Sequence, residues 1–243
     1  MVCIFGSCRV LYGPRNYGPH RPFSFTHSSK VVLQLLKWKD KTIEELKNIY
    51  CNELYLLSDD VKSFQDFIDK INNIKNYVNK SNLIIIEICS LKEVLYNDIY
   101  LLWHRCNNKV LNNEYYPLFQ EDEHKKIFNK LQHITSNKNE IINDLNEIKN
   151  ILNDKKILFI PHFTAKINKE GEYIQERIFL KEILFEFCKN NQNCYLFDHL
   201  NFVDDNYETF YLNNNGYIDT CHMSQNCKKI IRRKLNIIVN KLK

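Results

Sequence analysis

Short runs of apolar residues recur along the chain between longer polar segments, and they predict buried strands. The runs do not alternate regularly with polar residues, which is typical of parallel strands covered on both faces of a sheet. Helical patterns separate the runs, so we expect a three-layer α/β/α sandwich with a parallel sheet. The four predicted strands are Val2–Phe5, Leu83–Ile88, Ile157–Ile160 and Cys194–Phe197.

Apolar residues at helical spacing predict the helices between these strands. Val31, Val32, Leu35 and Trp38 mark one face of a first helix, which the preceding His27-Ser28 pair is suited to cap. Further helices are expected over residues 61–78, 176–188 and 224–242. The last of these is basic, and its inward face is expected to comprise Ile230, Ile231, Leu235, Ile238 and Leu242.

Residues 121–152 form a long pattern of polar and apolar positions that does not contain a predicted strand. Its apolar positions follow one helical face, and a break is expected near Ser136-Asn137. We interpret this stretch as a helical insertion, a hairpin of two helices. A chain of 243 residues buries most of its apolar surface in one core, so residues 1–243 are expected to form a single domain.

Composition and charge are those of an ordinary globular protein, with 44% hydrophobic and 26% charged residues. The formal net charge is +5. Its clusters, Lys228-Lys229 and Arg232-Arg233-Lys234, are interpreted as a solvated helix face rather than a nucleic-acid site. No apolar run approaches the roughly 20 residues that span a bilayer. We therefore expect neither nucleic acid nor a membrane as partner, and the oligomeric state stays open.

The nine cysteines are expected to be reduced thiols in a cytoplasmic compartment. The chain begins without a signal-peptide pattern, and an odd count argues against a disulfide framework. Cys221, His222 and Cys227 lie close in sequence. Their spacing contains no compact Cys-x-x-Cys pair, so no metal site is expected.

A candidate nucleophile follows the first predicted strand. The strand runs into Gly6-Ser7-Cys8-Arg9, where a glycine lets the backbone turn tightly just as the chain leaves the sheet. Backbone N–H groups of a following helix would point toward this position. The alternative is that Cys8 is a small core residue, which is the commoner role of a cysteine after a buried strand.

A candidate base lies near the other end of the chain, in Ile218-Asp219-Thr220-Cys221-His222-Met223-Ser224. A carboxylate three residues before a histidine can orient the imidazole and stabilise its cation, which a base serving a nucleophile requires. The alternative is a helix-capping aspartate beside a solvated histidine. Together the two segments supply nucleophile, orienting carboxylate and base in the order Cys8, Asp219, His222.

These two blocks resemble those of the SGNH (GDSL-like) hydrolases. Gly6-Ser7-Cys8 is similar to a variant of their Gly-Asp-Ser block, in the form found in GSCFA-type and capsular-polysaccharide-biosynthesis SGNH-like proteins, and Asp219-Thr220-Cys221-His222 is similar to their Asp-x-x-His block. The resemblance implies a flavodoxin-like strand order over nearly the whole chain. It also implies a Cys8–His222–Asp219 triad acting on ester bonds.

The resemblance is incomplete at the oxyanion hole. The predicted strand Leu83–Ile88 runs into Cys89-Ser90-Leu91-Lys92 and lacks the asparagine that the family places there. The backbone N–H of Cys8 is expected to supply one donor. Ser90 is a candidate replacement for the missing amide, with capping of a following helix as the alternative.

Other polar residues are expected at the same edge of the sheet, beyond the carboxyl ends of the strands. Ser7 and Arg9 flank the nucleophile, and Arg9 is suited to lower the pKa of Cys8 or to hold an anionic group. His27 precedes the first helix, and Gln34 lies on it. His162 follows the third predicted strand, and Arg177 opens the next helix. Each has an ordinary structural alternative: a surface ion pair, a cap, core packing or a solvated helix face.

The function expected from these residues is acyl-ester hydrolysis or O-acyl transfer through a thioester on Cys8. The resemblance implies an acetylated carbohydrate as substrate. No cofactor is required for hydrolysis, and coenzyme A is the implied acyl source if the reaction is a transfer. The alternative is a catalytically inactive SGNH-like module that binds a glycan or a protein.

Overall fold

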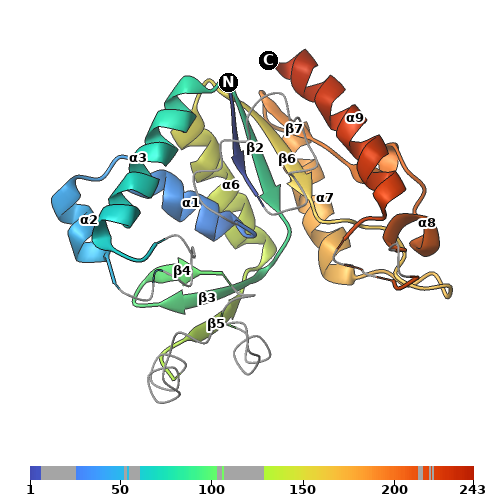
Figure 1. Cartoon of the computed structure of the whole chain (residues 1–243), viewed down its shortest axis with the longest axis horizontal. Coiled ribbons are helices and arrows are strands. Elements are labelled where there is room, and N and C mark those ends of the chain that lie inside the picture. Colours follow the sequence, from blue (N-terminus) through green and yellow to red (C-terminus); the bar gives the residue numbers. More distant parts are fainter. Residues whose placement is uncertain are drawn as a thin grey trace.

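The computed structural model describes residues 1–6, 26–51, 54, 61–102, 106, 129–212, 216–218, 220 and 222–243. Its centre is a four-stranded sheet, and every neighbouring pair of strands is parallel (Figure 1). All four predicted strands are confirmed. In spatial order they are β1 (Val2–Phe5), β2 (Leu83–Ile88), β6 (Lys156–Pro161) and β7 (Cys194–Leu196).

Helices cover both faces of this sheet, which confirms the three-layer α/β/α architecture (Figure 1). Side chains of successive strand residues point to opposite faces, so Cys3, Ile84 and Phe159 pack on one face and Ile4, Ile85 and Leu158 on the other. The first face is covered by α1 (Ser29–Trp38), α3 (Phe64–Lys80), α6 (Lys138–Leu152) and α7 (Gln175–Lys189). The second is covered by α8 (Tyr207–Tyr211) and α9 (Gln225–Leu242).

The spatial order β1-β2-β6-β7 follows the order of these strands along the chain. A flavodoxin-like order has one more strand on the outer side of the first, and within the described residues no strand occupies that position. α2 (Ile43–Ile49) lies between α1 and α3 in the chain and begins with a capping box of Thr42 and Glu45. A short 3-10 helix, η5 (His199–Asn201), follows β7.

A second, antiparallel sheet was not expected from the sequence. It contains β3 (Lys92–Tyr96), β4 (Ile99–Leu101) and β5 (Gln132–Thr135) in the order β4-β3-β5. Asn97 and Asp98 connect β3 to β4 with φ angles of 47° and 60°. Two consecutive positive φ angles are typical of a tight hairpin turn, and asparagine and aspartate tolerate them better than most residues.

The helical insertion expected over residues 121–152 is therefore only partly present. Gln132–Thr135 is a strand, and helix begins at Lys138, where Asn137 caps it with Glu140 in a capping box. The predicted break near Ser136-Asn137 is the start of α6, which lies in the crossover from β2 to β6. The expected hairpin of two helices is wrong for residues 129–152, and residues 121–128 lie outside the described part of the chain.

The first helix begins as expected, because the Ser28 hydroxyl accepts a hydrogen bond from the Val31 N–H and caps α1. The inward face of α9 differs from the expectation at Ile230, and it also includes Cys227 and Val239. Ile231, Leu235 and Val239 are buried, whereas Ile230 is 40% exposed. Neighbouring residues on a helix are turned by about 100°, and in α9 this turn takes Ile230 away from the stripe that contains Ile231, while Cys227, four residues before Ile231, lies on that stripe.

Within the described residues, no helix is long and apolar enough to cross a membrane.

The dependence of the second sheet face on α9 yields a stability prediction. Leu235→Ala should lower the free energy of unfolding by about 2–5 kcal/mol, because the side chain is 2% exposed and its removal leaves a cavity against the sheet. Ile237→Ala on the same helix should change it by less than about 0.5 kcal/mol, because Ile237 is half exposed. Urea unfolding followed by circular dichroism measures both, and equal effects would contradict this assignment of the faces.

Candidate active site

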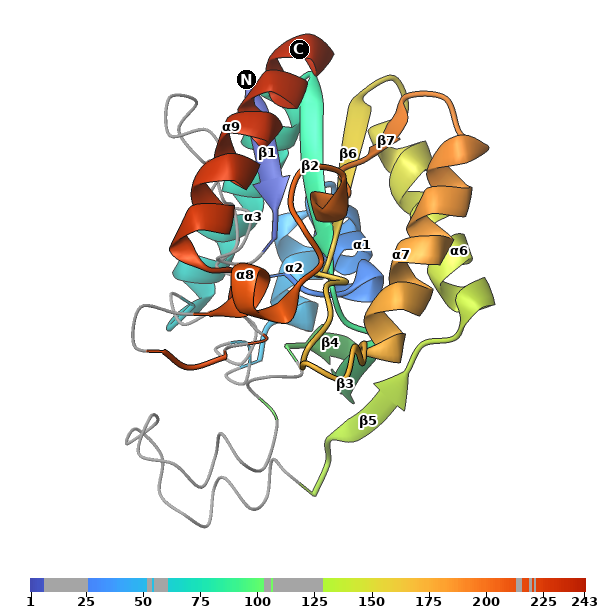
Figure 2. The same cartoon turned by 90° about the vertical axis from the view of Figure 1, so that its right-hand side faces the viewer.

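The candidate residues that the structure describes converge on one edge of the central sheet. The four strands are parallel, so their carboxyl ends lie at the same edge. α7 and α9 run back in the opposite direction and begin at this edge (Figure 2). His27, Ser90, His162, Arg177 and His222 all belong to segments that reach it. This is where open α/β sheets bind their ligands.

The candidate nucleophile and the candidate orienting carboxylate are not among the described residues. Ser7, Cys8, Arg9 and Asp219 lie outside them, and the chain is described up to Gly6, directly after β1. His222 is described and exposed. It stands two residues before Ser224, whose hydroxyl accepts a hydrogen bond from the Cys227 N–H and caps α9. The position of His222 is therefore set relative to the capped start of α9.

Two hydrogen bonds attach the segment after His222 to α8. The Ser224 N–H donates to the Phe210 carbonyl at 2.7 Å, and the Ser224 hydroxyl donates to the Thr209 carbonyl at 2.7 Å. An antiparallel bridge between Leu212 and Ile218 closes the chain that connects α8 to this segment. The backbone around His222 is thus held on its C-terminal side.

Arg177 holds the same segment on its N-terminal side. It lies in the first turn of α7, and its Nη1 donates to the Thr220 carbonyl at 2.9 Å and to the Tyr211 hydroxyl at 3.4 Å. The Tyr211 side chain is fully buried, so the guanidinium is held by a rigid partner. The sequence predicts Arg177 at the site as a ligand for an acidic group. The structure adds a contact with the chain between Asp219 and Cys221.

His162 is a buried imidazole at the carboxyl end of β6, with 6% of its surface exposed. Its Nδ1 accepts a hydrogen bond from the Phe163 N–H at 2.7 Å. Accepting at Nδ1 leaves the ring proton of the neutral form on Nε2. The ring also meets Phe163 edge-on at a centroid distance of 5.0 Å. His162 is thus fixed in orientation at the edge where the sequence predicts it.

Ser90 and His27 are brought together through the backbone. The N–H groups of Cys89 and Ser90 both donate to the His27 carbonyl, at 2.8 and 3.0 Å. The Ser90 hydroxyl accepts from the Lys92 N–H and donates to the Lys92 carbonyl, each at 3.0 Å. Capping of a helix by Ser90 is wrong, because the chain continues into β3. The Ser90 hydroxyl already donates its proton to the Lys92 carbonyl. It could donate to an oxyanion only if this turn opened.

A buried carboxyl that we did not expect from the sequence lies at the same edge. Glu87 is the fifth residue of β2 and is 1% exposed. Strand alternation places it on the face that Leu83 and Ile85 share, under α8 and α9. The signal for it was present in the sequence as the one charged residue inside an otherwise apolar run, and a buried charge of this kind is rare without a partner.

A second buried carboxyl, Glu93 of β3, lies between the small sheet, α1 and α6. It is 1% exposed, its Oε2 accepts from the Ser136 hydroxyl at 2.9 Å, and its Oε1 has no hydrogen-bond partner within the described residues. Burial raises the pKa of Glu93 to about 7, although Ser136 and the Lys30 ammonium act in the opposite direction. Asp144 lies nearby, accepts from the Ser29 hydroxyl at 2.6 Å, and also has a pKa raised by burial.

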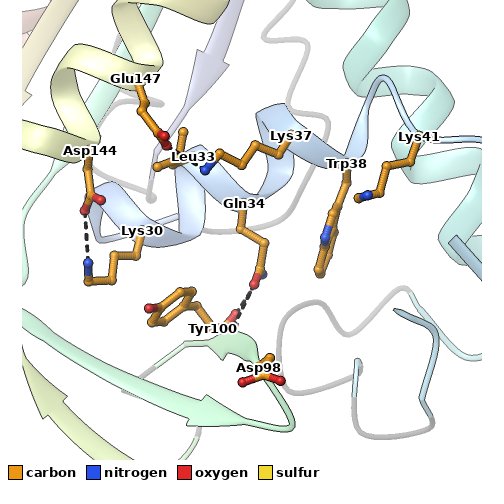
Figure 3. Close-up of a pocket in the computed structure, with 10 residues that line it drawn as sticks. All are labelled: Lys30, Leu33, Gln34, Lys37, Trp38, Lys41, Asp98, Tyr100, Asp144 and Glu147. Atoms are coloured by element: carbon orange, nitrogen blue, oxygen red, sulfur yellow. Dashed lines mark hydrogen bonds and ion pairs between the residues drawn. The ribbon is translucent and has the colours of Figure 1, made fainter. Parts of the chain in front are cut away.

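A hollow of about 340 Å³ lies beside this cluster, between α1, α6 and the β3–β4 hairpin (Figure 3). Gln34 lines the hollow, but its side-chain amide is already hydrogen-bonded to the Tyr100 backbone. Its nitrogen donates to the Tyr100 carbonyl at 3.0 Å, and its oxygen accepts from the Tyr100 N–H at 2.7 Å. Lys30 and Lys37 are paired with Asp144 (3.5 Å) and Glu147 (2.6 Å). The hollow therefore presents balanced charge, with no excess of either sign.

Burial holds several thiols of this chain in the protonated form. It raises the pKa of Cys3 and of Cys188 to about 12, and it also raises the pKa of Cys194 and of Cys227. The Cys227 thiol bonds to the Thr209 carbonyl at 3.3 Å. Within the described residues, no group of three or more His, Cys, Asp or Glu side chains is arranged to hold a metal ion.

Comparison with protein-family models gives no match for this chain, and comparison with curated protein sequences gives none either.

The contact of Arg177 with Thr220 leads to a prediction about local stability. Arg177→Met should increase amide hydrogen exchange in a peptide covering Thr220 and His222, because the carbonyl loses a charged donor, while global stability should fall by only about 1–2 kcal/mol. Lys181→Met is the matched control. It breaks the 2.9 Å bridge from the same helix to Asp198 and should leave exchange in that peptide unchanged. Equal exchange in parent and Arg177→Met would contradict an anchoring role.

The buried carboxyl of Glu93 yields a prediction about pH. Its folded-state pKa, about 7, lies above the ordinary glutamate value of 4.5, so the folded state binds the proton more tightly than the unfolded chain does. This contribution is fully present below about pH 4.5 and is lost as pH rises through 7, a change of about 3 kcal/mol at most. Glu93→Gln should flatten the stability profile between about pH 5 and 8.

Urea unfolding at several pH values measures this effect, with the exposed Glu182→Gln as control. The control should keep the pH profile of the parent, since Glu182 is on the solvent side of α7. A Glu93→Gln variant that loses stability with rising pH as steeply as the parent would show that another group is responsible.

Proposed function

We propose that this chain is an acyl-ester hydrolase or O-acyltransferase that uses Cys8 as nucleophile, His222 as base and Asp219 as the residue orienting the base. One observation carries the proposal. The segment bearing His222 is anchored by Arg177 and Ser224 at the edge of the sheet where β1 ends and the chain continues toward Cys8. This anchoring supports the proposal, because the described ends of the two SGNH-like blocks, Gly6 and His222, both belong to segments at this edge.

The reaction follows from the chemistry of these groups. His222 takes the proton of the Cys8 thiol, and the thiolate attacks the ester carbonyl carbon to form a tetrahedral oxyanion. Collapse expels the alcohol, which receives the proton from His222, and leaves a thioester on Cys8. Attack by water then gives hydrolysis, and attack by an acceptor hydroxyl gives acyl transfer. If the first acyl donor is a thioester such as acetyl-coenzyme A, the same thioester forms on Cys8.

His222 is suited to the role of base because it is exposed at a fixed backbone position. A histidine exchanges protons readily near neutral pH. The buried thiols of Cys3 and Cys188 differ from the proposed nucleophile, because their raised pKa values keep them protonated and unreactive. A thiol of this chain that reacts rapidly near pH 7 would therefore need a specific base, and the sequence pairs Cys8 with His222.

The proposed substrate is an acetylated carbohydrate, an implication of the resemblance to capsule-biosynthesis SGNH-like proteins. The second candidate function is a non-catalytic module that binds a glycan or a protein. The observation favouring it is the engagement of the Ser90 hydroxyl with the Lys92 backbone. An oxyanion hole without that donor gives weaker stabilisation of the tetrahedral intermediate.

Hydrolysis of a short-chain aryl ester tests the proposal. Cys8→Ala and His222→Ala should each lower kcat/KM by about 10²-fold or more, because they remove the nucleophile and its general base. Cys8→Ser keeps an attacking oxygen and should retain part of the activity. Cys188→Ala is the matched control, because the pKa of its thiol is raised to about 12 and it takes no part in the reaction.

Alkylation by iodoacetamide gives a second measurement in the same proteins. Cys8 should be labelled fastest near pH 7, and His222→Ala should slow that labelling while leaving Cys188 unchanged. Ester cleavage that survives both Cys8→Ala and His222→Ala would exclude the proposed mechanism. If the parent protein cleaves no ester, transfer from acetyl-coenzyme A to sugar acceptors is the measurement that decides between the enzyme and the binding module.

A further inference from the structure

The positive charge of this chain is concentrated in its last helix. α9 contains Lys228, Lys229, Arg232, Arg233, Lys234 and Lys241, and Lys243 follows it, with no acidic residue among them. The formal net charge of the whole chain is +5. The segment from Gln225 to Lys243 contributes +7, so the rest of the chain carries −2. The electrostatic potential is therefore expected to be most positive along α9, while the rest of the molecule is weakly acidic.

This distribution of charge opposes the stability of the helix itself. The first turn of α9 contains no acidic residue, although the N-terminal end of a helix favours negative charge. Lys229 and Arg233 stand four residues apart and repel each other on the helix surface. An anionic partner would relieve this repulsion on binding, so the relief adds to the affinity for such a partner.

The outward face of α9 carries exposed isoleucines as well as cations. Ile230 is 40% and Ile237 50% exposed, and they stand two turns apart on one side of the helix. Lys229, Arg233 and Lys241 are exposed on the outward side, and none of the three is paired with a carboxylate of the described residues. Figure 2 shows α9 on the outside of the molecule along its whole length, which is about 27 Å for a helix of 18 residues.

We propose that the outward face of α9 docks on the surface of an anionic lipid bilayer. The lysine and arginine side chains would meet the negatively charged headgroups, and Ile230 and Ile237 would enter the boundary between headgroups and acyl chains. A nucleic-acid backbone accounts for the cations alone, because it offers no apolar region for two isoleucines that lie between them. The helix would lie along the surface.

The segment leading into α9 also carries exposed apolar side chains. Leu212, Tyr217 and Ile218 are 42%, 71% and 38% exposed, and Leu212 and Ile218 are joined by the antiparallel bridge. Amphipathic tyrosine side chains are favoured at membrane interfaces. The sequence alone favours a solvated face for the basic cluster of α9 and places Ile230 inside. The exposure of Ile230 changes that interpretation, because apolar and basic groups now share the outer side.

Co-sedimentation of the full chain with lipid vesicles tests the proposal. The protein should bind vesicles of phosphatidylcholine containing about one-third phosphatidylserine and should bind pure phosphatidylcholine far more weakly. Each basic residue near such a surface contributes about fivefold to binding, so Lys229→Ser/Arg233→Ser/Lys241→Ser together should weaken it about 100-fold. Binding should also fall when salt shortens the Debye length to about 3 Å.

Two further variants separate lipid from other anions. Ile230→Ser/Ile237→Ser keeps every cation and should weaken vesicle binding by about tenfold or more. Lys47→Ser/Lys75→Ser/Lys80→Ser makes the same change of charge on α2 and α3, on the opposite side of the sheet, and should bind as the parent does. Cys8→Ala should also bind normally, since docking does not depend on the proposed chemistry.

The proposal is overturned if the parent protein does not bind the anionic vesicles, or if the triple α9 variant binds them as well as the α2/α3 control. Binding of a DNA or RNA duplex that the isoleucine variant retains in full, without binding to vesicles, would identify α9 as a nucleic-acid surface instead.

Discussion

The central strands of this protein are buried on both faces, and the rest of the architecture follows from that constraint. All six residues of β2 are buried, including the single carboxyl among them. A sheet with such strands must be covered twice, and the chain does so unequally. Among the described residues, one face is covered by helices from the crossovers between strands, whereas the other is covered by α8 and α9 after β7 and by Phe163 and Ala165 after β6. The position of α9 is therefore set by the need to cover Val2, Ile85 and Leu158.

That need also positions the candidate active site. α9 packs against the sheet and begins at the carboxyl edge of the strands, so the residues just before its N-cap are delivered to the edge where β1 ends. His222 reaches this edge because Ser224 is the cap. Arg177 lies at the same edge because α7 also begins there and Arg177 is in its first turn. The bond from its guanidinium to the Thr220 carbonyl joins α7 to the segment that precedes α9, and it holds the chain beside His222.

The sequence was sufficient to predict the elements that obey a simple periodicity, and insufficient for those that depend on distant contacts. The four central strands are short apolar runs, and Ser28 is recognisable as a cap. The small sheet is different, because its strands are three to five residues long and β5 is mostly exposed, so no apolar run marks it. The site shows the same division. His222 and Cys8 are visible as motifs, whereas the Arg177 contact joins residues 43 positions apart and leaves no local signal.

The exposure of Ile230 on α9 bears on the proposed docking surface. With Ile230 assigned to the core, the basic outer face of the helix is interpreted as solvated. With Cys227 in the core position instead, the outer face contains isoleucines among its cations. The sheet buries the apolar inward face of this helix, whereas the isoleucines of its outer face stay exposed. Because His222 lies directly before this helix, anything that binds its outer face would also lie beside the proposed catalytic base, and a bilayer would bring that base close to the headgroup region.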